Sequence, residues 1–83
     1  MYKTYILQSE KTGRYYVGST RDLENRVREH NSGETKSIKS GIPWRLVHVE
    51  EFGTSGEALR KETEIKARGA GRYLKGVSNQ QPG

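Results

Sequence analysis

A predicted strand, turn and short helix occupy residues 14–33, and this unit constrains the fold more than any other stretch of the chain. The strand, over residues 14–19, is rich in aromatic and β-branched types and runs into the turn types of residues 18–20. We expect the helix to span residues 22–31, because polar residues follow it and Gly33 is a typical helix stop.

An arginine and a histidine lie on the face that this helix must bury. At about 100° per residue, they share an arc of roughly 100° with the helix's only large apolar residues. An arginine is seldom turned inward unless an anion meets it. That anion is either a carboxylate of the protein itself or a phosphate brought by a substrate. The residues of this arc are Leu23, Val27, Arg26 and His30.

The length and composition of the chain limit the classes of protein to which it can belong. Its 83 residues are 30% hydrophobic, which predicts one domain with a small core. It contains no cysteine, which excludes disulfides and thiolate zinc sites. No apolar run is long enough for a signal peptide or a membrane span. We therefore expect a cytoplasmic protein, associated with the nucleoid if it is bacterial.

The net charge of +5 favours a polyanionic partner, although a basic surface also serves solubility alone. Residues 1–59 hold nine Lys and Arg against eight Asp and Glu, whereas residues 60–83 hold six against two. The basic end of the chain and the stretch before Pro43 therefore supply candidate contacts to a phosphate backbone. These candidates are Lys36, Lys39, Arg68, Arg72 and Lys75.

Two further strands and a loop are expected outside this first unit. Residues 2–9 have the composition of a strand, and the polar stretch before Arg14 is the right length for a hairpin loop. Pro43 suits the start of a third strand over residues 44–52. Its His48 stays outside the candidate site, because a lone strand histidine is more often partly buried packing than a ligand. Residues 34–43 lack periodicity, which predicts a mobile loop.

A second helix is expected over residues 54–69, and it carries a carboxylate on its apolar stripe. The stripe consists of Ala58, Leu59 and Ile65. Glu62 falls between them, where a carboxylate requires compensation. Glu62 therefore either pairs with Arg26 inside the protein or ligates a metal ion beside a bound phosphate.

The C-terminal stretch beyond the second helix has two parts. Residues 70–77 form either a short third helix or an extended arm, and residues 78–83 are expected to be a disordered tail.

The order of these motifs resembles the GIY-YIG endonuclease domain, in particular its small stand-alone members, over nearly the whole chain. Lys3-Thr4-Tyr5 stands for the first family motif and keeps only its tyrosine. Tyr16-Val17-Gly18 is a normal variant of the second motif. Arg26 and His30 stand at the spacing of the family's helix arginine and the residue, His or Tyr, that follows it.

The second predicted helix extends the resemblance. Glu57-Ala58-Leu59 followed by Glu62 is similar to the segment that carries the family's metal-binding glutamate. Two positions depart from the pattern. Ser19 stands where some members have a basic residue, and nothing convincingly matches an asparagine that many members keep beyond the glutamate. The resemblance implies an α+β fold, in which helices flank a three-stranded antiparallel sheet and residues 1–77 form the nuclease domain.

The resemblance also implies a metal-dependent endonuclease that hydrolyses DNA phosphodiester bonds, of DNA repair, recombination or mobile-element type. Glu62 and waters would hold one Mg²⁺ or Mn²⁺ ion. Arg26 would bind the scissile phosphate through its planar fork. Tyr5 is the implied general base, with a pKa lowered by the cation-rich site, and His30 would orient Tyr5 or relay its proton. Tyr16 would hydrogen-bond the attacking water or a phosphoryl oxygen.

A second class of function is a catalytically weak nucleic-acid-binding module of the same fold that needs a partner. The inward glutamate favours the enzyme, because a binding module has no use for it. The small size favours the module, since no separate DNA-reading domain is present to confer specificity. We expect DNA as the partner, with a specificity-conferring protein or a second copy of the chain as a further option, and no membrane.

Overall fold

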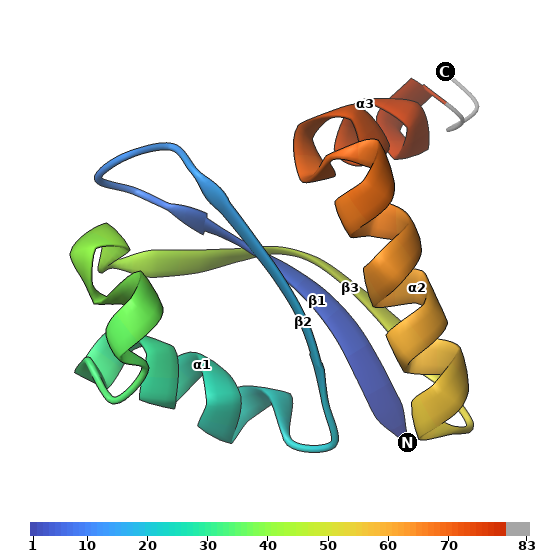
Figure 1. The fold of residues 1–83 in the computed structure, drawn as a ribbon, viewed down its shortest axis with the longest axis horizontal. Helices are drawn as coiled ribbons and strands as arrows, with labels where there is room; N and C mark the ends of the chain where they lie inside the picture. The colour runs from blue at the N-terminus through green and yellow to red at the C-terminus, as the bar shows by residue number, and fades with distance from the viewer. Residues whose placement is uncertain (80–83) are drawn as a thin grey trace.

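Three antiparallel strands form one sheet in the order β2-β1-β3 in the computed structural model, which describes residues 1–79 (Figure 1). The central strand is β1 (Tyr2–Ser9), and its neighbours are β2 (Tyr15–Thr20) and β3 (Trp44–Phe52). Tyr5 of β1 lies opposite Gly18 of β2, and Leu7 lies opposite Tyr16. This register places the side chains of Tyr5 and Tyr16 on the same face of the sheet.

Helices cover both faces of the sheet (Figure 1). One face packs against α1 (Leu23–Ser32) and the short 3₁₀ helix η1 (Lys36–Gly41). The other packs against α2 (Ser55–Arg68) and α3 (Ala70–Asn79). The α+β fold with a three-stranded antiparallel sheet flanked by helices is confirmed. None of the helices among residues 1–79 is both long and apolar enough to span a membrane.

The central strand β1 contributes to two separate cores because its successive side chains alternate between the faces. On the α2 face, the core consists of Ile6, Val17, Ile65 and Tyr73. On the α1 face, it consists of Tyr5, Leu7 and Trp44, with Tyr16, Leu23, Val27, Ile38 and Ile42 packed around them. Thr4 ties the sheet to α2, because its Oγ1 donates to the Ala58 carbonyl at 2.6 Å.

Capping residues fix the ends of α1 and the start of α2. Asp22 accepts a hydrogen bond from the Asn25 amide at the start of α1. Gly33 ends α1 with φ at 87°, a left-handed conformation that glycine adopts without a side-chain penalty. Thr54 caps α2 by accepting from the Glu57 amide. The predicted helix boundaries hold to within one residue for this reason.

Asn31, near the end of α1, joins both backbone groups of the first residue of β3. The Trp44 amide donates to Asn31 Oδ1 at 2.6 Å, and Asn31 Nδ2 donates to the Trp44 carbonyl at 3.0 Å. The two ends of residues 32–43 are therefore held together by one side-chain amide.

Two stretches differ from their predicted structure. Residues 36–41 form η1 within the predicted loop, because Ile38 packs in the core on the α1 face and its carbonyl accepts from Trp44 Nε1 at 2.9 Å. Residues 70–77 belong to a helix rather than an extended arm, and α3 extends to Asn79. Ser78 and Asn79, predicted as the start of a disordered tail, therefore belong to α3. The rest of the predicted tail, residues 80–83, lies outside the described residues.

Candidate active site

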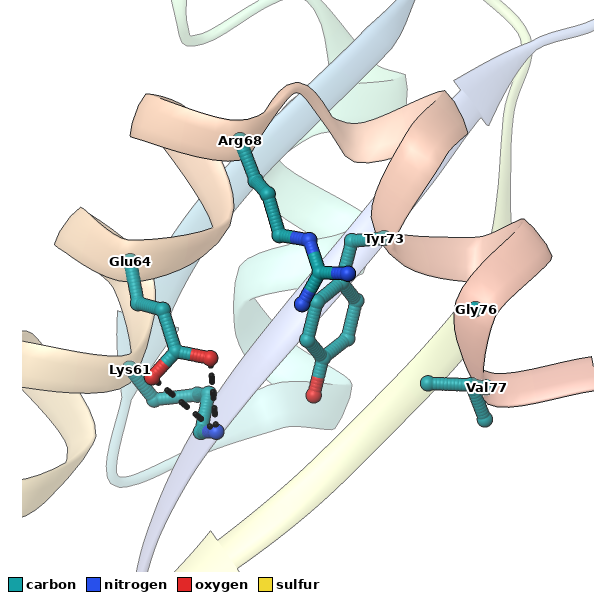
Figure 2. A pocket seen from close by; sticks show the side chains of 6 residues that line it. All are labelled: Lys61, Glu64, Arg68, Tyr73, Gly76 and Val77. Carbon is teal, nitrogen blue, oxygen red and sulfur yellow. Dashed lines mark hydrogen bonds and ion pairs between the residues drawn. The ribbon is translucent and has the colours of Figure 1, made fainter. Parts of the chain in front are cut away.

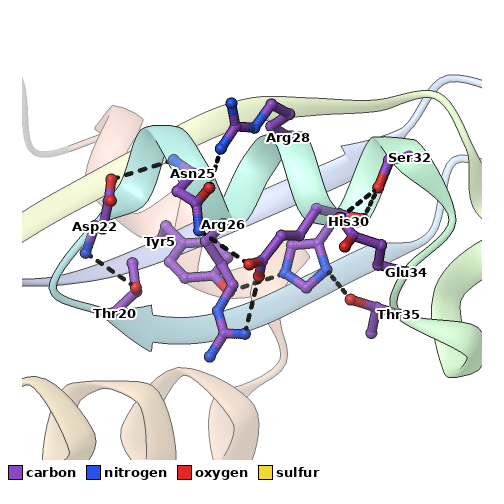
Figure 3. A network of polar contacts seen from close by, with 11 residues as sticks. Tyr5, Thr20, Asp22, Asn25, Arg26, Arg28, His30, Ser32, Glu34 and Thr35 are labelled. Atoms are coloured by element: carbon purple, nitrogen blue, oxygen red, sulfur yellow. Dashed lines mark hydrogen bonds and ion pairs between the residues drawn. The ribbon is translucent and has the colours of Figure 1, made fainter.

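A chain of three polar side chains runs beneath α1 (Figure 3). The Tyr5 hydroxyl lies 3.0 Å from Nε2 of His30, and Nδ1 of His30 lies 3.0 Å from Oγ1 of Thr35. Tyr5 and His30 are each 1% exposed, so their contact is shielded from bulk water. The structure thus joins a central strand, a helix and the loop before η1 through one imidazole ring.

Tyr16 lies beside this chain on the same face of the sheet. Its ring packs edge-on against His30, with centroids 4.9 Å apart, and lies 6.3 Å from the ring of Tyr5. Trp44 closes the other side of Tyr16 at 6.4 Å. Tyr16 is only partly buried, so of the two motif tyrosines it is the more accessible to a substrate.

Gly18 is required because the Tyr5 ring lies directly over its Cα. A Cβ at this position would lie 2.6 Å from the Tyr5 hydroxyl oxygen and 2.8 Å from Cζ. Its φ is not left-handed, since the positive-φ glycines among residues 1–79 are Gly13, Gly33 and Gly69. The demand for glycine therefore comes from contact alone.

Gly18→Ala is expected to lower the free energy of unfolding by about 1–3 kcal/mol, because the fully buried Tyr5 has no room to move away. Urea denaturation measures the change. Gly56→Ala is the matched control, since a Cβ there meets nothing within 4 Å and alanine favours a helix by up to about 1 kcal/mol. Equal free energies of unfolding for the two variants would contradict the claim that the Tyr5 ring leaves no room for a Cβ at Gly18.

Burial dominates the protonation states of the site. Burial, and next to it Tyr16, raises the pKa of Tyr5 above its usual value. The expectation of a lowered pKa is therefore wrong for the protein alone, because desolvation outweighs the effect of Arg26. Burial and the nearby Arg26 lower the pKa of His30, so its imidazole is neutral near pH 7. At that pH the Tyr5–His30 pair carries no charge.

Arg26 is not buried, which corrects the prediction from the helical wheel. Its side chain is 47% exposed and pairs with Glu29 at 3.4 Å. Arg26 is the outermost residue of the predicted arc, about 40° from His30, so it lies at the margin of α1 rather than beneath it. Its charge still acts on the Tyr5 hydroxyl and on His30. Arg26 therefore presents a guanidinium at the rim of the site.

Glu62 approaches from the opposite face of the sheet. Ser19 Oγ donates to its Oε1 at 2.8 Å, and Lys66 Nζ lies 2.6 Å from its Oε2. Its side chain is 15% exposed and forms no ion pair with Arg26 within residues 1–79, so the first of the two alternatives for Glu62, an internal pair with Arg26, does not hold. Leu59 was predicted on the buried stripe of this helix but is 57% exposed. The buried residues of α2 are Ala58 and Ile65.

The two halves of the site meet at the end of β2. Gly18 adjoins Tyr5 on the α1 face, whereas Ser19 turns to the α2 face and holds Glu62. The charges of Arg26 and Glu62 both influence the pKa of Tyr5, after burial and Tyr16, so the groups lie within electrostatic reach of one another. An edge strand thus separates a tyrosine–histidine pair from a carboxylate, with an arginine at the rim.

The predicted nucleic-acid contacts are all exposed, and the elements that carry them lie on two sides of the molecule (Figure 1). Lys36 and Lys39 belong to η1, directly after Thr35. Arg68, Arg72 and Lys75 belong to the end of α2 and to α3.

Arg68 lines a cavity of about 200 Å³ between α2 and α3, next to Tyr73 and the Lys61–Glu64 pair (Figure 2). Glu50 of β3 adds a second carboxylate here, because it accepts from the Tyr73 hydroxyl and from His48. The two carboxylates offset the two cations, so this cavity is not a strong anion site. His48 serves α3 packing rather than the candidate site.

Sequence reasoning missed the roles of Ser19 and Thr35. In the sequence, Ser19 stands out only as a departure from a motif, yet its hydroxyl orients Glu62. Thr35 lies in a stretch without periodicity, where no pattern indicates which side chain turns inward. The one available signal is that threonine favours the position just before a helix, where Thr35 lies. That signal could not be used, because no sequence pattern predicts η1.

Comparison with known proteins gives concordant results. A sequence model described as the GIY-YIG catalytic domain matches residues 1–73. The chain is 39% identical over 67 residues to a UPF0213 protein of Halobacterium salinarum, and the match covers 80% of this chain and 86% of that protein. It is 41% identical over 75 residues to one of Staphylococcus saprophyticus, covering 89% and 90%.

A solved structure is similar along most of its length. The solution NMR structure of a UPF0213 protein from Bacillus halodurans has a TM-score of 0.57 and 33% sequence identity to this chain. The match covers 96% of this chain and 86% of that one.

Proposed function

The chain belongs to the GIY-YIG family, a family of nucleases, and we propose that it is a metal-dependent endonuclease that hydrolyses DNA phosphodiester bonds. One observation supports the proposal most. The buried Tyr5–His30 hydrogen bond lies within electrostatic reach of Arg26 and of Glu62, which come from two different helices. Hydrolysis of a phosphodiester needs these types of group, namely a proton acceptor, a cation for the phosphoryl oxygens and a ligand for a metal ion.

The residues present fit a magnesium or manganese ion better than a zinc ion. No group of three or more His, Cys, Asp or Glu within residues 1–79 is arranged to hold a metal. Mg²⁺ keeps several of its waters and needs only one or two carboxylates together with substrate phosphates. Glu62 offers one such carboxylate, and a metal ion would compete with Lys66 for its Oε2. A bound ion would supply charge neutralisation on the leaving-group side of the phosphate.

The side chains of the protein divide the remaining work. Arg26 presents its guanidinium fork to the phosphoryl oxygens at the rim of the site. Tyr5 is protonated at rest, so it acts as a base by taking a proton from water while it gives its own to His30. Tyr16, which is more accessible, hydrogen-bonds the water or a phosphoryl oxygen.

A plasmid-nicking assay tests the proposal. Supercoiled DNA should be nicked with Mg²⁺ or Mn²⁺ and remain intact with EDTA. Binding of DNA without any nicking under either metal would reject the enzyme and support the catalytically weak binding module instead.

The uneven charge of the chain predicts where DNA is held outside the site. Neutralising Arg68, Arg72 and Lys75 together should weaken binding similarly for all sequences. The slope of log affinity against log salt should flatten by up to about 0.9 for each phosphate that is no longer neutralised, while the cleavage rate at saturating DNA changes little. The double change Lys36→Gln and Lys39→Gln serves as the comparison. If the slope is unchanged in the triple variant and flatter in the double variant, the phosphate contacts are made by η1 instead.

A further inference from the structure

Thr35 occupies the cap position of η1 but does not use its hydroxyl as a cap. A threonine before a helix normally accepts a hydrogen bond from a backbone amide of the first turn. Here no side-chain cap bond forms, and Oγ1 instead lies 3.0 Å from Nδ1 of His30. The hydroxyl is therefore committed to the imidazole that also contacts Tyr5.

Both ring nitrogens of His30 thus have a hydrogen-bond partner, and the donor or acceptor role of one nitrogen fixes the role of the other. A neutral imidazole has one N–H donor and one acceptor nitrogen. If Nδ1 carries the proton and donates to Thr35, Nε2 must accept from the Tyr5 hydroxyl. If Nδ1 accepts from Thr35, Nε2 must donate, and the tyrosine proton has no acceptor in His30.

We propose that Thr35 is a positioning residue that keeps the proton of His30 on Nδ1, so that Nε2 accepts the proton of Tyr5 and the Thr35 hydroxyl passes a proton on to solvent. The inference rests on the proposed role of Tyr5 as the base. Thr35 is half-buried whereas His30 is fully buried, so of the two residues in this contact Thr35 is the one that solvent reaches. Figure 3 shows Tyr5, His30 and Thr35 in one line beneath α1.

The transfers balance along this line. An O–H bond of the attacking water breaks, and its proton goes to the Tyr5 oxygen while the tyrosine proton moves to Nε2 of His30. The Nδ1 proton moves to Thr35 Oγ1, and the hydroxyl proton of Thr35 leaves to solvent. His30 therefore ends neutral with its proton on Nε2. The chain resets as the leaving oxygen departs: that oxygen takes the hydroxyl proton of Tyr5, Nε2 returns its proton to Tyr5, Nδ1 takes the Thr35 hydroxyl proton, and Thr35 takes a proton from solvent.

A relay suits this site better than storage of the proton on His30. Burial and then Arg26 lower the pKa of His30, and Glu29 only partly opposes them, so an imidazolium is disfavoured. If His30 releases its Nδ1 proton to Thr35 while Nε2 receives the proton of Tyr5, the imidazole never becomes positively charged. The groups that face the imidazole from neighbouring elements are Tyr5 of β1, Tyr16 of β2, Arg26 and Glu29 of α1, and Thr35.

Nitrogen-15 NMR of the histidine ring tests the tautomer directly and without any cleavage. In the wild-type protein we expect Nδ1 of His30 to resonate as protonated and Nε2 as unprotonated. Thr35→Val, nearly the same shape without a hydroxyl, should move the two shifts toward each other, and Thr35→Ser should restore them. His48, which contacts Glu50 instead, is an internal reference in the same spectrum.

A hydroxyl elsewhere provides the matched control. Thr12→Val removes a hydroxyl that accepts from the Arg14 amide in the β1–β2 turn, and it should leave the His30 shifts unchanged. If Thr35→Val does not fold, Thr35→Ala takes its place. A wild-type protein with Nε2 protonated, or a hydroxyl-free variant with wild-type shifts, would overturn the proposal.

Cleavage at saturating DNA tests the relay. Thr35→Val should lower the rate about fivefold to tenfold, which corresponds to the loss of one hydrogen bond, whereas Thr35→Ser should stay within about twofold. A wild-type rate in Thr35→Val would overturn the proton exit through Thr35. If the wild-type protein does not cleave DNA at all, the proposed function fails, and the NMR shifts alone decide whether Thr35 sets the tautomer.

Discussion

Glu62→Gln is expected to reduce metal-dependent cleavage below detection while DNA binding stays close to normal. Glutamine keeps the shape of the side chain and an oxygen that accepts from Ser19 Oγ. It removes the negative charge that a hard divalent cation requires. The variant should therefore lose both DNA cleavage and affinity for the metal ion. Paramagnetic broadening of NMR signals by Mn²⁺ measures the metal affinity.

Stability separates the metal-ligand role of Glu62 from a structural role. Its only ion pair within residues 1–79 is the i,i+4 contact with the exposed Lys66, which is typically worth about 0.5 kcal/mol or less. Breaking a buried pair would instead cost roughly 3–5 kcal/mol. Glu64→Gln is the matched control, because Glu64 lies on the same helix and pairs with Lys61 rather than contacting Ser19. Wild-type cleavage by Glu62→Gln would remove the assignment.

Arg26→Ala is expected to lower the cleavage rate by two or more orders of magnitude, about 3 kcal/mol of transition-state stabilisation. In the proposed function the guanidinium binds charge that develops on the phosphoryl oxygens, so the loss should appear in the rate at saturating DNA. The free energy of unfolding should change by less than about 0.5 kcal/mol, because the pair with Glu29 is exposed.

Arg28→Ala controls for the loss of one positive charge from α1. Arg28 is exposed on the same helix and contacts Asn25, away from Tyr5. It should weaken DNA binding slightly and leave the cleavage rate unchanged. Equal rates for the two variants would mean that Arg26 contributes only to the general field of the surface.

Most of the fold could be predicted from the sequence because each element carries a local signal. β1 and β3 have the predicted bounds, since aromatic and β-branched residues fill both strands and turn types limit them. Caps such as Asp22 and Gly33 limit α1 in the same way. The helix η1 could not be predicted, because it depends on contacts of Ile38 and Trp44 with a core that only the folded chain assembles.

The candidate site was predicted less well, because a helical wheel shows which way a side chain points but not whether it is buried. Arg26 and Leu59 lie at the margins of their stripes, where the wheel cannot tell burial from exposure. The partner of Glu62 depends on which face each residue of β2 presents, and so on the strand register. Thr35 belongs to a loop, and its contact with His30 depends on how that loop returns to the sheet.

The amide of Asn31 has a consequence for how this small protein can diversify. Because it closes the neck of residues 32–43 on Trp44, an insertion within that excursion does not have to move the first residue of β3. Each doubling of a flexible loop costs only about 0.6 kcal/mol in closure entropy. Lys39 and Ser40, both exposed, lie between the anchors at Ile38 and at Gly41, whose carbonyl accepts from Ser9. Additional residues inserted there would extend from η1 and leave the sheet in place, so a small domain of this fold can acquire an additional surface as a longer loop rather than as a second domain.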